Sequence, residues 1–248
     1  MSEVLERGDL FFFYRPRVRA DEVRDLSDVQ RTFVILEPDG RTRYRRLIVG
    51  RKRLPRAESH EREWAFVAEV ADDPEAMRDD IERKAYETRT RGPRVQPEAR
   101  PAGEGRYAIV DHDGHTHLAY ALELPREPGD VQRELGIAPQ ASYIVAVRNP
   151  DAPAPPGLGL PSGRRADFPP ELRERFRGRR FAPLNPPDFL DFEGAEVVLI
   201  AAAADAAREL GIDLDAEAER LEDADVFADL RLRPGEVPVE PLQTGEWR

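Results

Sequence analysis

The sequence predicts an α+β fold built from antiparallel β-hairpins with peripheral helices. Short runs of β-branched and aromatic residues recur along the 248-residue chain, as strands require. Turn sequences that contain Asp-Gly join several of these runs into hairpins. Between them lie short segments that begin with a helix-capping residue and end at glycine.

The first half of the chain predicts four strands and one helix. The strands cover residues 10–14, 33–36, 44–49 and 64–70. The first has aromatic residues on both faces, so we expect it to be buried. A Pro-Asp-Gly turn joins the second and third into a hairpin. Asp73 then caps a helix with Pro74 at its first position and with Met77, Ile81 and Ala85 on one face.

The second half predicts four more strands, four helices and a long loop. The strands cover residues 107–110, 118–124, 142–147 and 196–202, the loop covers 148–166, and the helices cover 131–135, 167–177, 205–210 and 213–229. Glycine ends the first three helices, at Gly136, Gly178 and Gly211. The last contains eight acidic residues and one arginine, so we expect an acidic amphipathic helix with Leu214, Ala218 and Leu221 inward.

A segment rich in proline and glycine, residues 87–105, is the best candidate for a linker. It predicts an N-terminal module over 1–90 and a C-terminal module over 103–230. Asp-Val-Gln-Arg occurs before a strand in both, at 28–31 and 130–133, and this repeat suggests that the two modules arose by duplication of one α+β unit.

Composition excludes several classes of function. Charged residues make up 35% of the chain and the net charge is −11, which argues against a protein that coats nucleic acid generally. Cysteine is absent, so disulfides and thiol catalysis are excluded. No apolar run approaches the roughly 20 residues of a membrane span. The N-terminus lacks the pattern of a secretory signal, so we expect a cytoplasmic protein with no membrane partner.

Three of the four histidines lie in one short run, at His112, His115 and His117. If Asp113-Gly114 forms a two-residue turn, His112 pairs with His115, and all three imidazoles share one face of the hairpin. The opposite face, with Tyr107, Ile109, Leu118, Tyr120 and Leu122, is then the core side.

Three histidines with an open fourth position suit catalytic zinc. One interpretation of this spacing is a zinc-dependent hydrolase, whose general base would come from elsewhere, such as Asp188, Asp191 or Glu193. The alternative is a polar hairpin tip, because His, Asp, Gly and Thr all suit exposed turns. A three-residue turn would also shift the register and separate the ligands.

A basic ribbon covers residues 41–56, RTRYRRLIVGRKRLPR, with eight basic residues and no acidic one. Arginine and aromatic side chains together can hold phosphates and stack bases. The candidate contacts to nucleic acid or another anion are Arg43, Arg45, Arg51 and Lys52. Two alternatives are favoured over a nucleic-acid site: a solvated edge, or pairing with the acidic residues 213–229.

A second basic cluster comprises Arg173, Arg175, Arg177, Arg179 and Arg180. Glu171 and Glu174 interrupt it, so an exposed helix with internal ion pairs explains it. No G-x-G-x-x-G or G-x-x-x-x-G-K-[ST] motif occurs, which argues against the usual nucleotide-binding folds.

Two stretches, GEGRYAIVDHDGHTHLAYALELP (103–125) and RRFAPLNPPDFLDFEGAE (179–196), carry a resemblance. They resemble segments of a conserved family of uncharacterised microbial and fungal proteins, some of which are described as transcription factors. The resemblance covers the second half of the chain and implies no activity, cofactor or catalytic residue. No helical pattern of the BTB type supports the transcription-factor description.

The sequence therefore favours a binding or interaction protein whose partner is an unknown protein or an anionic ligand. The alternatives are a zinc-dependent hydrolase at the histidine hairpin and weak nucleic-acid binding through the basic ribbon.

Overall fold

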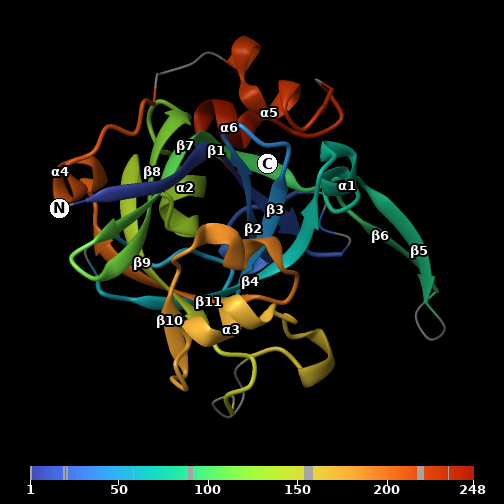
Figure 1. The fold of residues 1–248 in the computed structure, drawn as a ribbon. Helices are drawn as coiled ribbons and strands as arrows, with labels where there is room; N and C mark the ends of the chain where they lie inside the picture. Colours follow the sequence, from blue (N-terminus) through green and yellow to red (C-terminus); the bar gives the residue numbers. More distant parts are fainter. Residues whose placement is uncertain are drawn as a thin grey trace.

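Eight antiparallel strands close into a β-barrel in the structure of the chain, a computed structural model (Figure 1). Around the barrel the strand order is β9-β11-β4-β3-β2-β1-β7-β8, and β8 pairs in turn with β9. The structure describes residues 2–18, 20, 22–57, 59–88, 92–153, 159–216, 221–233 and 235–248.

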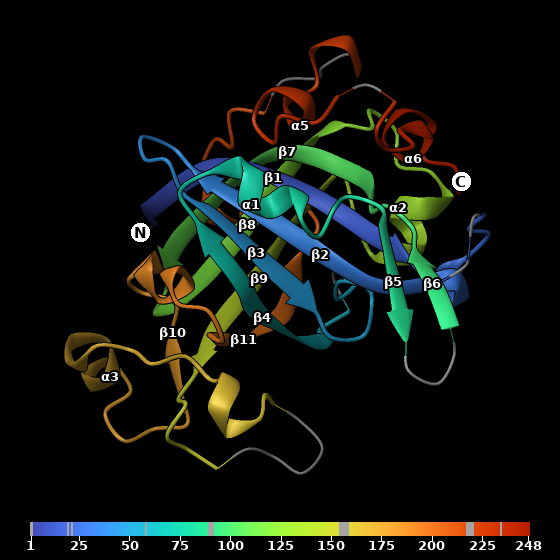
Figure 2. The same cartoon turned by 90° about the vertical axis from the view of Figure 1, so that its right-hand side faces the viewer.

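The longer strands build the barrel, and three shorter strands of the described residues lie outside it. The strands are β1 (Glu3–Pro16), β2 (Val29–Pro38), β3 (Tyr44–Val49), β4 (Arg62–Ala71), β5 (Lys84–Thr88), β6 (Gly92–Gln96), β7 (Arg100–His112), β8 (His115–Leu124), β9 (Gln140–Arg148), β10 (Phe181–Pro183) and β11 (Glu196–Ala203). β10 pairs with the C-terminal end of β9 and extends the sheet there. β5 and β6 form a separate hairpin that projects from the barrel (Figure 2).

The helices of the described residues are short. The α-helices are α1 (Pro74–Arg78), α2 (Asp130–Leu135), α3 (Pro170–Arg175), α4 (Ala206–Leu210), α5 (Asp225–Ala228) and α6 (Glu240–Thr244), and the 3-10 helices are η1 (Leu26–Asp28), η2 (Ser162–Arg164), η3 (Pro187–Asp191) and η4 (Leu221–Asp223). None of these helices has the length and apolar character that crossing a bilayer would need.

The predicted α+β class is wrong, because the fold is mostly β and its sheet closes on itself. Strand patterns in the sequence report single strands and local hairpins. Closure depends on pairs between distant segments, such as β1 with β7 and β4 with β11. The predicted modules, 1–90 and 103–230, both contribute strands to this one barrel.

Most individual elements were correctly predicted. The hairpin of β2 and β3, the strands β4, β9 and β11, and the helices α2, α3 and α4 all occur where the sequence placed them. Gly136, Gly178 and Gly211 follow these helices with positive φ angles, as predicted for helix ends.

Two predicted elements are wrong. The linker at 87–105 instead contains β6 and the start of β7. The acidic helix at 213–229 is replaced by η4 and α5, and Ala218 lies outside the described residues. The helix after Asp73 is shorter than predicted and ends at Arg78. Met77 and Ile81 are both buried, as expected, but Ile81 lies beyond the helix and Ala85 lies in β5.

The barrel interior is filled by side chains, as expected for eight strands. Leu10, Phe12 and Tyr14 of β1 point into it, and the cavity that remains among the apolar residues is about 20 Å³. Full burial of one such side chain stabilises the fold by roughly 1.5–3 kcal/mol. Where β7 bends beside β8, Gly105 is required, because a Cβ atom there would lie 2.1 Å from the carbonyl oxygen of Ala121.

Short helices cover parts of the outer surface and both ends. Phe11 and Phe13 alternate with the interior residues of β1 and pack on the outside beneath α1, α5 and α6. α4 covers the small side chains of β7 and β8. α2 lies near the end of the barrel where the C-terminus is found, and η3 and α3 lie at the opposite end, where β1 begins (Figure 2).

Candidate anion-binding site

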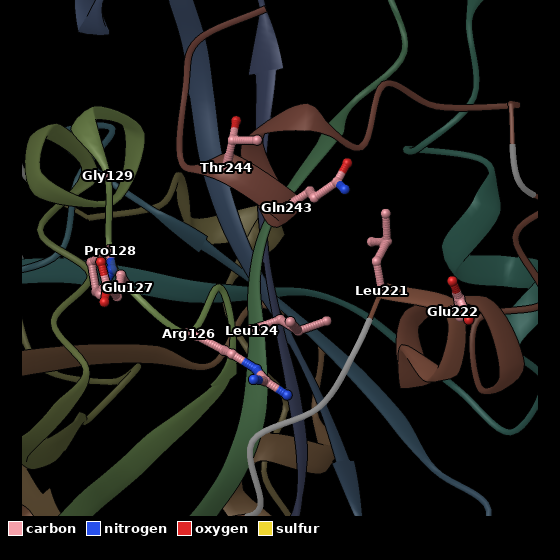
Figure 3. A pocket seen from close by; sticks show the side chains of 9 residues that line it. All are labelled: Leu124, Arg126, Glu127, Pro128, Gly129, Leu221, Glu222, Gln243 and Thr244. Atoms are coloured by element: carbon pink, nitrogen blue, oxygen red, sulfur yellow. The ribbon is translucent and has the colours of Figure 1, made fainter.

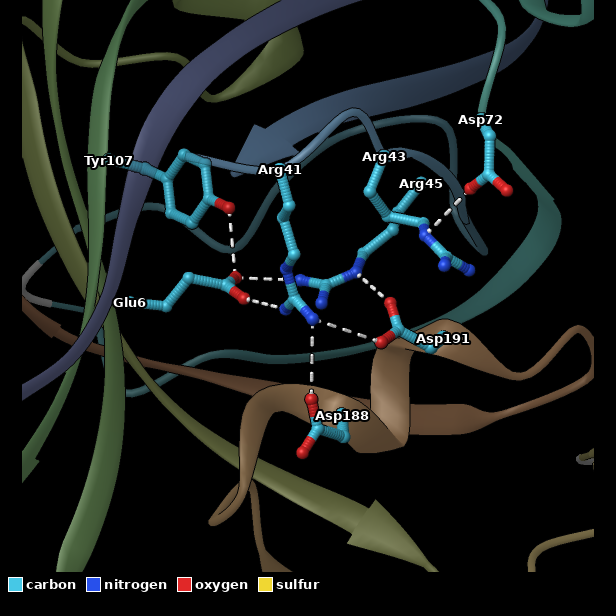
Figure 4. Close-up of polar contacts among 8 residues, drawn as sticks. All are labelled: Glu6, Arg41, Arg43, Arg45, Asp72, Tyr107, Asp188 and Asp191. Carbon is cyan, nitrogen blue, oxygen red and sulfur yellow. Dashed lines mark hydrogen bonds and ion pairs between the residues drawn. The ribbon is translucent and has the colours of Figure 1, made fainter. Parts of the chain in front are cut away.

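The basic ribbon folds into a buried ionic network at the end of the barrel where β1 begins (Figure 4). β3 carries Arg45, whose Nη1 lies 2.6 Å from Glu6 Oε1 and whose Nε lies 2.7 Å from Asp191 Oδ1. Arg41 reaches the other oxygen of Glu6 at 2.5 Å and contacts Asp188 and Asp191 at 3.5 and 3.4 Å. Arg45 is 0% exposed, whereas Arg41 keeps part of its surface open to solvent while it pairs with three carboxylates.

Tyr107 and the ribbon arginines hold Glu6 from opposite sides. The hydroxyl of Tyr107 donates to Glu6 Oε1 at 2.9 Å, and burial raises the pKa of Tyr107 above its usual value. Arg45 Nη2 is buried without a hydrogen-bond partner in the described part of the chain. Because removing one member would leave the others buried and uncompensated, we regard the network as structural.

Most of the rest of the ribbon is also engaged within the molecule. Four of the five remaining arginines face a carboxylate: Arg43 Nε lies 3.0 Å from Asp72, Arg46 Nη2 lies 2.7 Å from Glu69, Arg51 Nη1 lies 3.5 Å from Glu63, and Arg53 Nη1 lies 2.8 Å from Glu61. The fifth, Arg56 at the end of the ribbon, is exposed and has no ion pair in the described part of the chain. Lys52 donates to the carbonyl of Val29. The predicted contacts Arg43, Arg45, Arg51 and Lys52 therefore lie along one ribbon, but with internal partners that come from outside 213–229.

The histidine hairpin has the predicted register. His112 pairs with His115 and Val110 pairs with His117, and Asp113 and Gly114 have φ angles of 50° and 81°. Tyr107, Ile109 and Tyr120 belong to the barrel core, and Leu118 and Leu122 pack against it, so the core side was correctly predicted.

The three histidines nevertheless differ in their surroundings. The rings of His112 and His117 lie 6.0 Å apart, edge to face, and Ser2 Oγ lies 2.9 Å from His112 Nδ1. His117 is buried beneath α4, which lowers its pKa, while His115 is exposed. Across the described residues, no group of three or more His, Cys, Asp or Glu residues has the geometry to hold a metal ion. The predicted zinc ligands thus share a hairpin face, and zinc binding by His112, His115 and His117 stays a prediction that this geometry does not support.

The second basic cluster forms a pocket of about 250 Å³, which we call the arginine pocket. Its lining consists of Asp111, Arg175, Arg177, Arg179, Ala182, Pro183 and Asn185. All three of these arginines are exposed, and their guanidinium groups make no ion pair or hydrogen bond within the described part of the chain. The sequence predicted ion pairs between this cluster and Glu171 and Glu174. In the described part of the chain Arg173 alone of the cluster has ion pairs, and its partners are Asp167 at 2.6 Å and Asp151 at 3.2 Å.

The backbone beneath the arginine pocket is held firmly. Phe176, between Arg175 and Arg177, is 1% exposed and packs edge to face on Phe189, with ring centroids 5.5 Å apart. The next turn places Arg177 and Gly178 in the left-handed region, with φ angles of 48° and 72°. Asn149 Nδ2 donates to the carbonyl of Arg179 at 3.0 Å. The three cations therefore project from a fixed turn.

One carboxylate completes the arginine pocket. Asp111, near the end of β7, accepts a hydrogen bond from Asn185 Nδ2 at 2.8 Å. No arginine of the pocket lies within ion-pair distance of it in the described structure. The pocket thus presents three guanidinium donors and a separate acceptor. A neighbouring pocket of about 460 Å³ shares Arg175 and includes Arg43, Asp188 and Asp191.

A larger surface groove lies elsewhere and has charged residues of both signs. It has a volume of about 820 Å³ and is lined by the loop after β8, by η4 and by α6 (Figure 3). Its charged residues are Arg126, Glu127 and Glu222. This mixture does not select one kind of ligand.

Several carboxylates gather where α5 covers the barrel. Burial, followed by repulsion from Asp229, Asp9 and Asp225, raises the pKa of Glu37 to about 7. Burial and repulsion from Asp225 and Asp9 raise the pKa of Asp229 to about 6. Arg106 offsets this charge in part through its pairs with Asp9 and Asp39, the latter at 2.6 Å. We regard this cluster as a determinant of stability.

Comparison of the chain with protein-family models, curated proteins and solved structures finds no match.

Proposed function

We propose that the chain is a binding protein that holds an anionic partner in the arginine pocket. The observation that supports the proposal is that Arg175, Arg177 and Arg179 line one pocket and lack internal partners. In the ribbon, in contrast, every arginine from Arg41 to Arg53 is paired with a carboxylate. Cations that a fold leaves together and uncompensated are available to a ligand.

The chemistry of the arginine pocket fits an oxyanion. A guanidinium group presents paired N–H donors that match the oxygens of a phosphate or carboxylate. Because the turn is anchored by Phe176 and Asn149, little ordering should accompany binding. The pocket lining supplies guanidinium donors together with the Asp111 carboxylate and the Asn185 amide, and this set of groups suits the binding of an oxyanion.

Retention on a heparin column tests the proposal. We expect the wild-type protein to be retained at low salt despite its net charge of −11, because the pocket is a local positive patch. Replacing Arg175, Arg177 and Arg179 together by glutamate should abolish retention. The side chains are exposed, so the variant should fold, which circular dichroism can verify.

The matched control replaces Arg17, Arg56 and Arg208 by glutamate. These arginines are also exposed and have no ion pair in the described structure, and the change in net charge is the same. We expect this control to be retained like the wild type. Equal elution of the two triple variants, or an unretained wild type, would overturn the proposal.

A further inference from the structure

Beside the arginine pocket, two aromatic side chains meet on the outer surface of the barrel. Trp64 of β4 and Phe181 of β10 have ring centroids 6.0 Å apart, with an angle of 47° between the rings. Phe181 is 37% exposed, and Trp64 is partly exposed. An aromatic side chain left open to solvent is informative, because burying it would stabilise the fold.

The strand register places this pair on an apolar strip. Trp64 lies opposite Val198 of β11, Val198 lies opposite Ala146 of β9, and Ala146 lies opposite Pro183 of β10. Their sequence neighbours point into the core, so these side chains lie on the outside. Neither of the two core clusters that pack helices against the outer surface includes the strip.

Cations without internal partners flank the aromatic pair on both sides. Arg62 precedes Trp64 by two residues and lies on the same outer face of β4. Arg179 and Arg180 immediately precede Phe181. The backbone N–H of Asn149 donates to the carbonyl of Arg180 at 2.9 Å. Arg62 and Arg180 are exposed, and within the described part of the chain their guanidinium groups have no ion pair.

We propose that the anionic partner is a single-stranded nucleic acid, whose phosphates contact the arginine pocket and whose bases stack on Trp64 and Phe181. This inference rests on the proposed function. Aromatic platforms beside a basic groove are the means by which proteins hold single strands without reading their sequence. Asp111 adds an acceptor for a sugar hydroxyl or a base amino group. An acidic peptide would use the arginines but has no need of the exposed rings.

Binding of an oligothymidylate of about 12 nucleotides tests the inference. Fluorescence anisotropy of the labelled oligonucleotide gives its affinity for the wild type and the variants. Phe181→Ala should weaken binding roughly 5- to 150-fold, the range expected for the loss of one base stack. Tyr86→Ala is the matched control, because Tyr86 is 44% exposed but lies on β5 of the projecting hairpin, and its affinity should not change.

A second readout locates the bases directly. In the Trp247→Phe variant, Trp64 is the only tryptophan of the chain, and the oligonucleotide should quench its fluorescence. Affinity should also fall steeply as salt rises from about 50 to about 200 mM.

The outcomes separate this inference from the proposed function. Oligonucleotide binding that depends on the three pocket arginines but not on Phe181, without quenching of Trp64, overturns the single-strand inference and leaves the anion site intact. Absence of oligonucleotide binding, with heparin retention that still depends on those arginines, does the same and favours an acidic peptide. A wild-type protein that neither binds the oligonucleotide nor is retained on heparin would overturn both proposals.

Discussion

The chain contains two arginine-rich segments of similar composition that the fold treats in opposite ways. In the ribbon, Arg45 is fully buried between Glu6 and Asp191. In the turn after α3, Arg177 is exposed and has no partner within the described residues. Local charge density is therefore a poor guide to which segment binds an anion. What distinguishes them is whether distant carboxylates are folded against them.

The largest effect should come from breaking the buried network. Arg45→Met should lower the free energy of unfolding by about 3–5 kcal/mol, because Glu6 and Asp191 would keep their charges in a largely buried site and share the half-exposed Arg41 as counterion. Arg177→Met should change it by less than about 0.5 kcal/mol, since that side chain contacts solvent. Chemical denaturation of both variants measures the difference. Equal losses of stability would remove the distinction between the two segments.

A smaller effect on stability should come from a partly buried carboxylate, Glu37, which extends the comparison from arginines to acidic residues. No cation pairs with Glu37 among the described residues, and burial raises its pKa from 4.5 to about 7. The folded state then holds a proton that the unfolded state releases, so the free energy of unfolding should fall as pH rises from about 4.5 to about 7. Glu37→Gln should flatten this part of the stability profile. Thermal unfolding measured across that pH range checks it, and an unchanged slope in the variant would count against the assignment.

Much of the local structure could be predicted from sequence. The Asp113-Gly114 turn set the histidine register, and Pro170, Phe176 and Gly178 marked α3 and its end. These features depend on residues close together in the chain. Closure of the barrel could not be predicted, because it depends on pairs such as Gly8 with Tyr107 and Tyr143 with Leu118, which no local pattern encodes.

The candidate site was predicted only in part, for the same reason. The arginines at 175–179 were identified, but Asp111 and Asn185 come from other elements and join them only in the folded chain. The ribbon was the more basic segment in sequence, yet its partners Asp72, Asp188 and Asp191 lie in segments that sequence reasoning could not bring to it.

The most direct measurement compares both segments in one experiment. Side-chain Nε–Hε signals of the arginines can be recorded by NMR while inorganic pyrophosphate is added, with assignments from single arginine-to-lysine variants. The account predicts that the signals of Arg175, Arg177 and Arg179 shift with the anion and that those of Arg41 and Arg45 do not. Shifts confined to the ribbon, or spread equally over both segments, would contradict it.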